Sequence, residues 1–367
     1  MIRFDQVTKR YPDGTVAVDA LELEAASGQI TVLVGPSGCG KTTSLRMINR
    51  MIEPTSGTIW LDDRDTSTMA THELRRSIGY VIQHAGLFPH KTVVDNVATV
   101  PLLLGTDKKQ ARRTAMELLE RVGLPGHFAK RYPAQLSGGQ QQRVGVARAL
   151  AADPPVMLMD EPFSAVDPVV REGLQDEFLR LQLELGKTIV FVTHDIDEAV
   201  KLGDRVAVLR VGGHLAQIAT PAELLSRPVD AFVAGFVGRD RGYRALGFAD
   251  AGTLATHDEP PVVLGAPVPG GSDGDDWLLA VDGSGAPQGW LDLASGAGTG
   301  GTVDDALLHR GGTLVAQGGT LRAALDACLS SPSGRGVVVD EGGAFVGTVT
   351  AREVLDLIEA RQPERRS

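Results

Sequence analysis

A glycine-rich turn near the start of the chain has the residues needed to hold a phosphate. The apolar run ITVLV (30–34) leads into GPSGCGKT (35–42), and a helical pattern follows. Glycines let successive backbone N–H groups curl around one anion, and the start of a helix adds the positive end of its dipole. Lys41 would place a charge on the β- and γ-phosphates, and Thr42 would offer a hydroxyl to Mg²⁺. The spacing Gly-x4-Gly-Lys-Thr between a strand and a helix therefore predicts a nucleotide phosphate site.

Later stretches supply the other groups that phosphate chemistry needs. VMLMDEP (156–162) is a buried strand pattern that ends in two adjacent carboxylates. Asp160 is suited to hold Mg²⁺ through water, and Glu161 to polarise an attacking water as a general base. An isolated Asp-Glu pair is usually a solvated strand end and a lone His is usually structural, but a position beside a phosphate turn favours function. The remaining stretches are GYVIQ ending in Gln83, LSGGQQQR (136–143), SAVD (164–167) and VTHD (192–195).

Strand and helix patterns alternate around these motifs, which predicts an α/β fold after a β-rich opening segment. Helical spacing of apolar residues is found at 44–52 and 107–122. A further helix is expected from Pro221, with Thr220 as its cap. The expected strands cover 1–11, 17–27, 28–35, 57–63, 77–83, 154–162 and 188–195, with a hairpin at 205–219.

In this order and approximate spacing, the motifs resemble those of the nucleotide-binding subunit of an ABC transporter. The resemblance covers residues 1 to about 237. It implies a P-loop ABC ATPase domain, with a β-rich N-terminal segment and a helical subdomain, which binds ATP and Mg²⁺. By this resemblance Glu161 is the general base, His194 contacts the γ-phosphate, and Gln83 senses Mg²⁺ and the attacking water.

The same resemblance assigns the binding residues. Thr42, Gln83 and Asp160 are expected around Mg²⁺. Tyr11 is expected to stack on adenine, although simple packing would also explain a lone tyrosine. The phosphate-binding set is Gly35, Pro36, Ser37, Gly38, Cys39, Gly40, Lys41, Thr42 and Thr43.

A second glycine-rich, helix-starting turn is present although the first already supplies a phosphate site. In the ABC family this turn binds the γ-phosphate of ATP held by the other subunit, so two copies enclose two ATP molecules in a symmetric homodimer. Asp167 is expected to cross that interface. Val166 stands where the family usually has Leu. The residues that would reach the partner's ATP are Ser137, Gly138, Gly139 and Gln140.

The sequence also bears on partners. No apolar run is long enough to span a membrane, so we expect separate transmembrane permease subunits, an extracytoplasmic solute-binding protein acting with them, and a peripheral place on the cytoplasmic face of the inner membrane. The polar start does not look like a signal peptide, and two distant cysteines suit a reducing cytoplasm. The net charge of −10 argues against nucleic acid as a partner. A soluble ABC ATPase acting on nucleic acid or ribosomes is the other class; such proteins usually carry two cassettes or a long coiled coil.

Two segments narrow the transporter type. VIQHAGLFPHKTVVDNVA (81–98) and FVAGFVGRDRGYR (232–244) resemble the quaternary-amine importers, which take up glycine betaine, choline, carnitine or proline. An importer of another small polar solute remains the alternative.

Composition changes near residue 238, which predicts a second module. Residues 238–367 hold 24 of the 44 glycines, ten Arg, no Lys and eighteen Asp or Glu, a net of −8. We expect an ATPase domain at 1–237, a linker at 238–256 and a regulatory domain at 257–367. AVDGSGAPQGWLD (280–292) recurs 58 residues later as VVDEGGAFVGTVT (338–350). The pattern predicts two glycine-turn hairpins related by an internal repeat, with chance similarity as the alternative.

This tail resembles a degenerate pair of CBS modules, a smaller α+β domain, with the second module at about 307–360. CBS pairs commonly bind adenine nucleotides through a hydroxyl and an Asp near the module's end. Thr350 supplies the hydroxyl, but Glu353 stands at the Asp position, and Asp292 stands at the hydroxyl position of the first copy. The tail is therefore expected to regulate by nucleotide or ionic strength, or to act as a scaffold.

Overall fold

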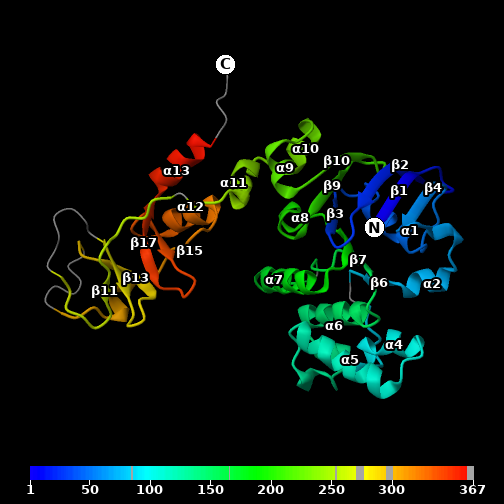
Figure 1. Cartoon of the computed structure of the whole chain (residues 1–367), viewed down its shortest axis with the longest axis horizontal. Helices are drawn as coiled ribbons and strands as arrows, with labels where there is room; N and C mark the ends of the chain where they lie inside the picture. Colours follow the sequence, from blue (N-terminus) through cyan, green and yellow to red (C-terminus); the bar gives the residue numbers. More distant parts are fainter. Residues whose placement is uncertain (84–85, 165, 253, 270–276, 295–300, 362–367) are drawn as a thin grey trace. The chain divides into compact units, whose positions relative to one another are not determined.

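The computed structural model of the chain describes residues 1–83, 86–164, 166–252, 254–269, 277–294 and 301–361 (Figure 1). Its contacts divide the chain into two compact units, Met1–Gly238, called unit 1, and Arg239–Ser367, called unit 2. The division falls where glycine becomes frequent in the sequence, and the second unit has no lysine. Each unit has its own sheets and its own buried core.

Two sheets build unit 1. An antiparallel sheet has the strand order β2-β1-β4-β5, and a second sheet has the order β10-β9-β3-β8-β7-β6. The second is parallel except for the β9–β10 hairpin. The strands are β1 (Ile2–Arg10), β2 (Val16–Ala25), β3 (Ile30–Val34), β4 (Ser56–Leu61), β5 (Arg64–Asp65), β6 (Ile78–Val81), β7 (Val156–Asp160), β8 (Thr188–Val192), β9 (Arg205–Leu209) and β10 (Leu215–Ala219).

Helices of unit 1 surround the parallel sheet and also form a separate helical layer (Figure 1). That layer contains α3 (Val93–Val97), α4 (Thr99–Leu103), α5 (Lys108–Arg121) and α6 (Gly138–Leu150), which contact one another. In α5 the predicted apolar face is buried, and the Asp107 carboxylate caps the first turn. The remaining helices are α1 (Lys41–Ile48), α2 (Thr71–Arg76), α7 (Pro168–Leu185), α8 (Ile196–Leu202), α9 (Pro221–Ser226) and α10 (Ala231–Phe236).

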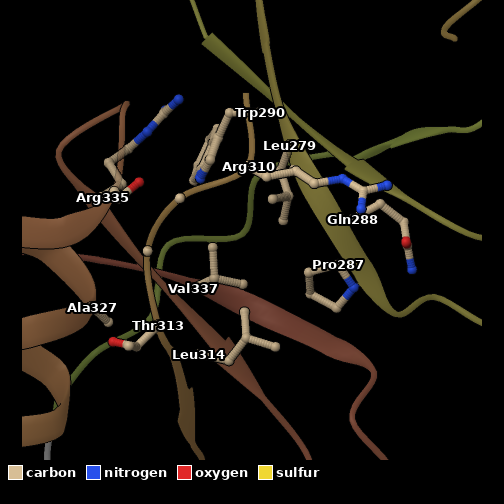
Figure 2. Close-up of a pocket in the computed structure, with 14 residues that line it drawn as sticks. Leu279, Pro287, Gln288, Trp290, Arg310, Thr313, Leu314, Ala327, Arg335 and Val337 are labelled. Carbon is tan, nitrogen blue, oxygen red and sulfur yellow. The ribbon is translucent and has the colours of Figure 1, made fainter. Parts of the chain in front are cut away.

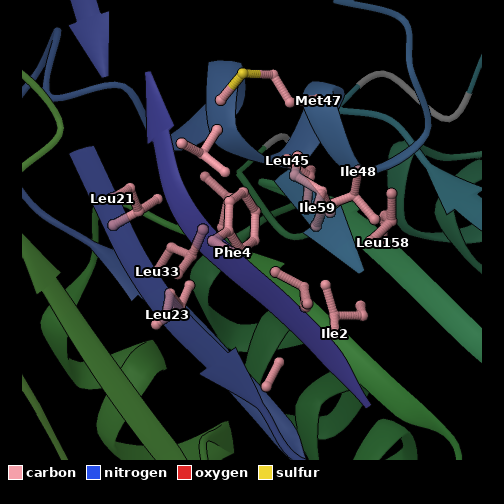
Figure 3. Packing of buried hydrophobic residues seen from close by; sticks show 14 of the residues in the cluster. Ile2, Phe4, Leu21, Leu23, Leu33, Leu45, Met47, Ile48, Ile59 and Leu158 are labelled. Atoms are coloured by element: carbon pink, nitrogen blue, oxygen red, sulfur yellow. The ribbon is translucent and has the colours of Figure 1, made fainter. Parts of the chain in front are cut away.

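The core of unit 1 fixes the position of α1. Phe4, 2% exposed, lies at the centre of a cluster in which side chains of both sheets meet those of α1 (Figure 3). Burying each such side chain stabilises the fold by about 1.5–3 kcal/mol. Because Leu45 and Ile48 are anchored there, the first turn of α1 is held at the end of β3. The labelled members are Ile2, Phe4, Leu21, Leu23, Leu33, Leu45, Met47, Ile48, Ile59 and Leu158.

Unit 2 contains two small sheets with two longer helices. The sheet orders are β11-β12-β13-β14 and β15-β16-β17. Trp290, 1% exposed, packs with residues of β12 and β16, so hairpins from both sheets share one apolar cluster. The elements are α11 (Arg241–Ala245), β11 (Val262–Val263), β12 (Trp277–Val281), β13 (Pro287–Asp292), β14 (Leu308–His309), β15 (Leu314–Ala316), α12 (Leu321–Ser330), β16 (Arg335–Val339), β17 (Phe345–Thr350) and α13 (Ala351–Ala360).

The two hairpins of unit 2 have the same register at the predicted offset. Val281 pairs with Pro287, and 58 residues later Val339 pairs with Phe345. The turns match as well, because the carboxylates of Asp282 and Asp340 each accept two backbone N–H groups of their own turn. The prediction of two glycine-turn hairpins is therefore confirmed.

Residues placed in a linker by sequence belong to the core of unit 2. The segment 241–248 forms α11 and a 3₁₀ turn, Leu246–Phe248. Leu246, Ala249 and Ala251 pack against α12 and its neighbours, because their apolar side chains are removed from water there. Residues 241–251 were expected in a linker, but they are part of the folded core of unit 2. Among the described residues, no helix has the length and apolar character needed to cross a membrane.

Candidate nucleotide site

Three neighbouring parallel strands of unit 1 carry the predicted motifs at one edge of the sheet. β3 ends at Val34 and is followed by the glycine-rich turn; β7 ends at Asp160, and β8 ends just before Thr193 and His194. Parallel strands place their carboxyl ends together, and ligands of such sheets bind there. The fold therefore brings together motifs that are more than a hundred residues apart in the sequence.

Two positions of the turn admit only glycine. Gly35 has φ +151°, and a Cβ there would lie 2.4 Å from the Leu209 carbonyl oxygen. Gly40 has φ +87°, and its Cβ would lie 2.3 Å from the Ala17 carbonyl oxygen. Backbone atoms cannot move away as a flexible side chain can, so the turn is packed against neighbouring strands. The glycines let the chain pass these strands and start α1 at Lys41.

Lys41 lies at the base of a cavity of about 480 Å³ above this turn. Its Nζ donates to the Gly35 carbonyl at 2.8 Å and to the Pro36 carbonyl at 3.1 Å, so the ammonium group is held inside the loop. Side chains of two other strand ends, Glu161 and His194, complete the wall. The lining residues are Ala17, Ser37, Gly38, Cys39, Gly40, Lys41, Thr42, Thr43, Glu161 and His194.

Asp160 and Thr42 place two oxygen atoms side by side. The Thr42 hydroxyl donates to Asp160 Oδ1 at 3.0 Å, and Arg46 Nη2 lies 3.7 Å from Oδ2. Burial raises the pKa of Asp160 above its ordinary value, against the opposing effects of the Thr42 hydrogen bond and the Arg46 charge. Oxygen ligands of this kind suit Mg²⁺, which takes one or two protein oxygens together with phosphate oxygens and water. Arg46 was not singled out by sequence, although its four-residue spacing from Thr42 on α1 puts both on one face.

The three predicted catalytic residues lie together, because the side chains of Gln83 and His194 both contact Glu161. Its Oε2 accepts from Gln83 Nε2 at 3.1 Å and lies 3.2 Å from His194 Nδ1. The Glu161 backbone has φ +46°, a left-handed conformation, and is fixed by its N–H bond to the Val192 carbonyl at 2.9 Å. Such strain costs of order 1–3 kcal/mol and persists where surrounding structure enforces it. Gln83 follows β6 in a turn, two residues beyond the strand end at Val81 rather than at the expected end of the strand.

Comparison with known proteins decides the family. The model of the family described as ABC transporter matches residues 18–164. The osmoprotectant import ATP-binding protein OsmV of Salmonella typhimurium is 41% identical over all of this chain and 98% of its own length. The chain belongs to the ATP-binding proteins of ABC transporters. It is an ABC ATPase, and the resemblance seen in its motifs is confirmed.

Other relatives agree with this assignment. The glycine betaine uptake system ATP-binding protein YehX of Escherichia coli is 46% identical over 71% of this chain and 84% of its own length. The glycine betaine/carnitine/choline transport ATP-binding protein OpuCA of Bacillus subtilis is 51% identical over 66% of this chain, which spans 63% of that protein. The ATP-binding cassette MJ0796, solved as a dimer in a post-hydrolysis state with ADP and Pi, is 36% identical and superposes with a TM-score of 0.55, over 60% of this chain and 99% of its own.

The second glycine-rich turn of this ABC ATPase lies at the start of α6 and apart from the cavity. Ser137 Oγ accepts the Gln140 N–H at 3.3 Å, and Gln140 Oε1 accepts the Ser137 N–H at 3.0 Å, which forms a capping box. Among the described residues that line the cavity, neither this turn nor Asp167 appears. Tyr11 is also outside that lining; its ring is 5.3 Å from Lys9 Nζ. One chain therefore gathers only part of the predicted site residues.

In unit 2 of the ABC ATPase, a cavity of about 250 Å³ lies beside the first hairpin (Figure 2). Trp290, Leu279 and Val337 point toward it, and Arg310 reaches across it. Arg335 points away: its Nη1 lies 3.0 Å from Glu259 Oε2, and its Nη2 donates to a backbone carbonyl. The cavity is thus lined by both apolar and polar groups, and the exposed side chain of Arg310 lies beside it.

The two residues carried over from CBS modules are used within the fold. Thr350 caps α13, and Glu353 Oε2 accepts from the Thr350 N–H at 2.9 Å and from its hydroxyl at 2.8 Å. Glu353 Oε1 lies 2.7 Å from His257 Nε2. Hydrogen bonds to Thr350 and His257 hold the pKa of Glu353 below its ordinary value, although burial acts in the opposite direction. In the first copy, Asp292 Oδ1 accepts the Ala294 N–H at 2.9 Å.

Proposed function

We propose that this chain hydrolyses ATP to power import of a compatible solute of the glycine betaine, carnitine or choline type through separate membrane subunits. The observation that carries the ATPase site is the convergence of Gln83 and His194 on Glu161, beside the cavity above Lys41. The solute class is supported by the names of OsmV, YehX and OpuCA. An importer of another small polar solute is the alternative.

The side chains divide the work of hydrolysis. The turn and Lys41 bind the β- and γ-phosphates, because oriented N–H groups and one ammonium charge suit an anion. Glu161 accepts a proton from the attacking water, while Gln83 and His194 hold that carboxylate and the γ-phosphate in line. Mg²⁺, bound near Thr42 and Asp160, would neutralise charge on the phosphate oxygens. Tyr11 would stack on the adenine ring once ATP is bound.

A second copy of the chain completes each site. The turn 137–140 starts the 13-residue helix α6 and is suited to bind the γ-phosphate of the ATP held by the partner. Asp167, exposed before α7, would cross the same interface. The dimeric state of MJ0796 supports this arrangement. Closure on ATP and reopening after hydrolysis then supply the mechanical stroke.

The remaining partners follow from transport. We place the ATPase dimer on the cytoplasmic face of the membrane, bound to transmembrane permease subunits that receive solute from an extracytoplasmic binding protein. Transport assays of the reconstituted complex with candidate betaines would identify the solute. Uptake of none of the betaines, choline, carnitine or proline would contradict the solute class and leave the ATPase assignment intact.

Residues 257–367 form the regulatory part in this proposal, a degenerate CBS-like pair. Support comes from the two hairpins in one register and from the cavity of about 250 Å³ beside them. Since Glu353 is engaged by Thr350 and His257, the usual carboxylate for a ribose is already occupied. This favours a response to ionic strength over a nucleotide response. Calorimetry of the full-length Lys41→Ala variant, whose ATPase site is blocked, measures whether the tail binds adenine nucleotides. Binding would support a nucleotide trigger, and no binding would support a response to ionic strength.

Mixed dimers test the shared site. Lys41→Ala removes the ammonium charge that binds the phosphates in one chain. Ser137→Arg blocks the turn that the other chain offers to its partner's ATP. A mixed dimer has one site with both lesions and one intact site, so an equimolar mixture should recover about one quarter of wild-type ATPase activity. Each variant alone should be inactive. Absence of rescue after full subunit exchange would rule out the composite site.

A further inference from the structure

One residue of helix α7, Arg171, contacts the segment that follows β7 and the loop that follows β8. Its Nη2 donates to the Val166 carbonyl at 3.1 Å, and its backbone N–H donates to the Asp167 carbonyl at 2.8 Å. Its Nη1 lies 3.9 Å from Oδ2 of Asp195. Asp195 directly follows His194 in the sequence. Arg171 thus joins the segment before α7 to the loop that carries His194.

The loop around His194 is fixed at its backbone while the imidazole ring stays accessible. The Asp195 N–H donates to Thr193 Oγ1 at 3.0 Å, and Asp195 Oδ1 accepts the Asp197 N–H at 2.8 Å at the start of α8. The His194 side chain is 65% exposed, and its Nδ1 lies 3.2 Å from Glu161 Oε2. An exposed ring has few packing contacts to restrict its rotamers, so its position depends on how the loop backbone is held.

A second contact ties α8 to the same helix. Gln175, one turn beyond Arg171 on α7, donates from Nε2 to Glu198 Oε1 at 3.2 Å, and both residues are buried. Burial raises the pKa of Glu198, although hydrogen bonds to its carboxylate oppose this shift. Two successive turns of α7 therefore brace α8 and the loop before it. Of the two contacts, the one made by Arg171 lies next to His194.

We propose that Arg171 is a positioning residue for ATP hydrolysis: by pairing with Asp195 it holds His194 against Glu161. The inference rests on the proposed function of His194 at the γ-phosphate. Arg171 itself does not line the described cavity, and so it acts through the loop rather than on the nucleotide. A small displacement of a positioned group lowers the rate of the chemical step strongly, while binding made by other groups is retained.

The variants Arg171→Ala and Asp195→Asn test this pairing in the full chain. Asparagine caps helices as well as aspartate does, so Asp195→Asn keeps the start of α8 and removes the charge that Arg171 meets. Each variant should lower kcat by about tenfold to a hundredfold, with the KM for ATP unchanged within about twofold. The double variant should be no slower than the slower single one, because both remove the same contact. Arg180→Ala, on the same helix and paired with Glu177 and Glu184, is the matched control and should leave kcat unchanged.

A His194→Ala background separates positioning from general stability. If Arg171 acts through His194, then Arg171→Ala has no further effect on single-turnover hydrolysis in that background. An equal loss in both backgrounds overturns the proposal. Where His194→Ala leaves no measurable turnover, the ring proton signals of His194, assigned with His194→Gln, give a second measurement. They should shift in Arg171→Ala and in Asp195→Asn but not in Arg180→Ala; unchanged signals overturn the proposal.

A wrong positioning role for Arg171 can be told apart from a wrong function for the site. Glu161→Gln tests the catalytic site directly and does not involve α7. If Glu161→Gln abolishes hydrolysis and both Arg171→Ala and Asp195→Asn keep full activity, the site assignment stands and the positioning inference is wrong. If Glu161→Gln hydrolyses ATP at the normal rate, the function proposed for the site fails first.

Discussion

Glycine-rich turns occur in both units, but their backbone donors meet different partners. In unit 2 the turns after β12 and β16 contain Gly285 at φ +83° and Gly343 at φ +82°. The carboxylate of Asp282 accepts the N–H groups of Ser284 at 2.8 Å and Ala286 at 3.1 Å, so an internal anion satisfies the turn. The Ser284 hydroxyl and these N–H groups hold the pKa of Asp282 below its ordinary value.

In unit 1 the comparable turn leads from a strand into a helix and opens on a cavity of about 480 Å³. Lys41, inside the turn, brings a positive charge where the turns of unit 2 have Asp282 and Asp340. A turn that carries its own carboxylate stabilises a hairpin, whereas a turn that carries an ammonium group is suited to an external anion. The comparison therefore favours the turn of unit 1 as the place that binds phosphate, and the regulatory role of unit 2 stays a proposal.

Removing the proposed base should give the largest effect. Glu161→Gln keeps the shape of the side chain and its reach to Gln83, but it cannot accept a proton. We expect kcat to fall by about 10²–10⁴-fold with ATP binding retained. Bound ATP should then accumulate and hold two chains together, which size-exclusion chromatography with ATP would show. Glu172→Gln, an exposed residue of α7, is the control and should behave as the unchanged chain.

Closing the phosphate turn should be nearly as damaging. Gly40→Ala puts a Cβ 2.3 Å from the Ala17 carbonyl oxygen at φ +87°, so the backbone must shift. A shift costing about 1–3 kcal/mol should weaken ATP binding by about fivefold to a hundredfold. Calorimetry with a non-hydrolysable ATP analogue measures the change.

The control for that measurement is Gly173→Ala. Gly173 lies within α7, and a Cβ there has no heavy atom within 4 Å. Alanine in a helix interior is favoured over glycine by about 1 kcal/mol, so this variant should be slightly more stable and should bind the analogue normally. Equal losses from Gly40→Ala and Gly173→Ala would contradict the close packing assigned to the turn.

Much of the difference between the turns of the two units could be predicted from sequence, because each turn is formed by a short, continuous stretch of the chain. The run ITVLV followed by glycines and Lys41 fixes a strand, a turn and a helix within twenty residues, and the structure has β3 and α1 there. The hairpins of unit 2 were equally local, since each needs only two short strands and a glycine turn. The family's motifs predicted roles for Gln83, Glu161 and His194 around one phosphate, whereas the contacts of Gln83 and His194 with Glu161 emerged only from the structure.

Long-range partners could not be read from one sequence. Arg46 reaches Asp160 across 114 positions, and Arg171 reaches Asp195 only because α7 runs back beside the loop. Nothing in the periodicity of either helix selects those charges from other exposed ones. The ordered segment 241–248 was missed for another reason: its short helix lacks a repeated apolar pattern and gains stability from packing on α12.

A substitution in the core of unit 2 should leave chemistry unchanged. Trp290 is 1% exposed and packs with residues of both hairpins. Trp290→Ala should destabilise unit 2 by about 3–5 kcal/mol, because a large cavity is left. Calorimetric unfolding should show a lowered transition for this unit, while ATPase activity stays within about twofold of wild type. Trp277→Ala, at a half-buried position, should give a smaller loss. Loss of ATPase activity with Trp290→Ala would contradict the proposal that unit 1 hydrolyses ATP independently of the fold of unit 2.

Removing unit 2 should have the smallest effect on chemistry and the most selective effect on transport. A chain ending at Gly238 keeps every residue proposed for ATP and should hydrolyse it within about twofold of the full chain. The deleted segment carries a net charge of −8, and exposed charges are screened over about 10 Å at 0.1 M salt. Contacts that it makes in the complex should therefore change with salt, and reconstituted transport by the shortened chain should lose part of its salt dependence.

Trp290→Ala supplies the matched comparison, because it disrupts the fold of unit 2 while keeping its charge. If truncation alters the salt response and Trp290→Ala does not, charge alone carries the effect; if both alter it, the folded hairpins are required. An unchanged salt response in both would show that unit 2 does not tune transport through ionic contacts.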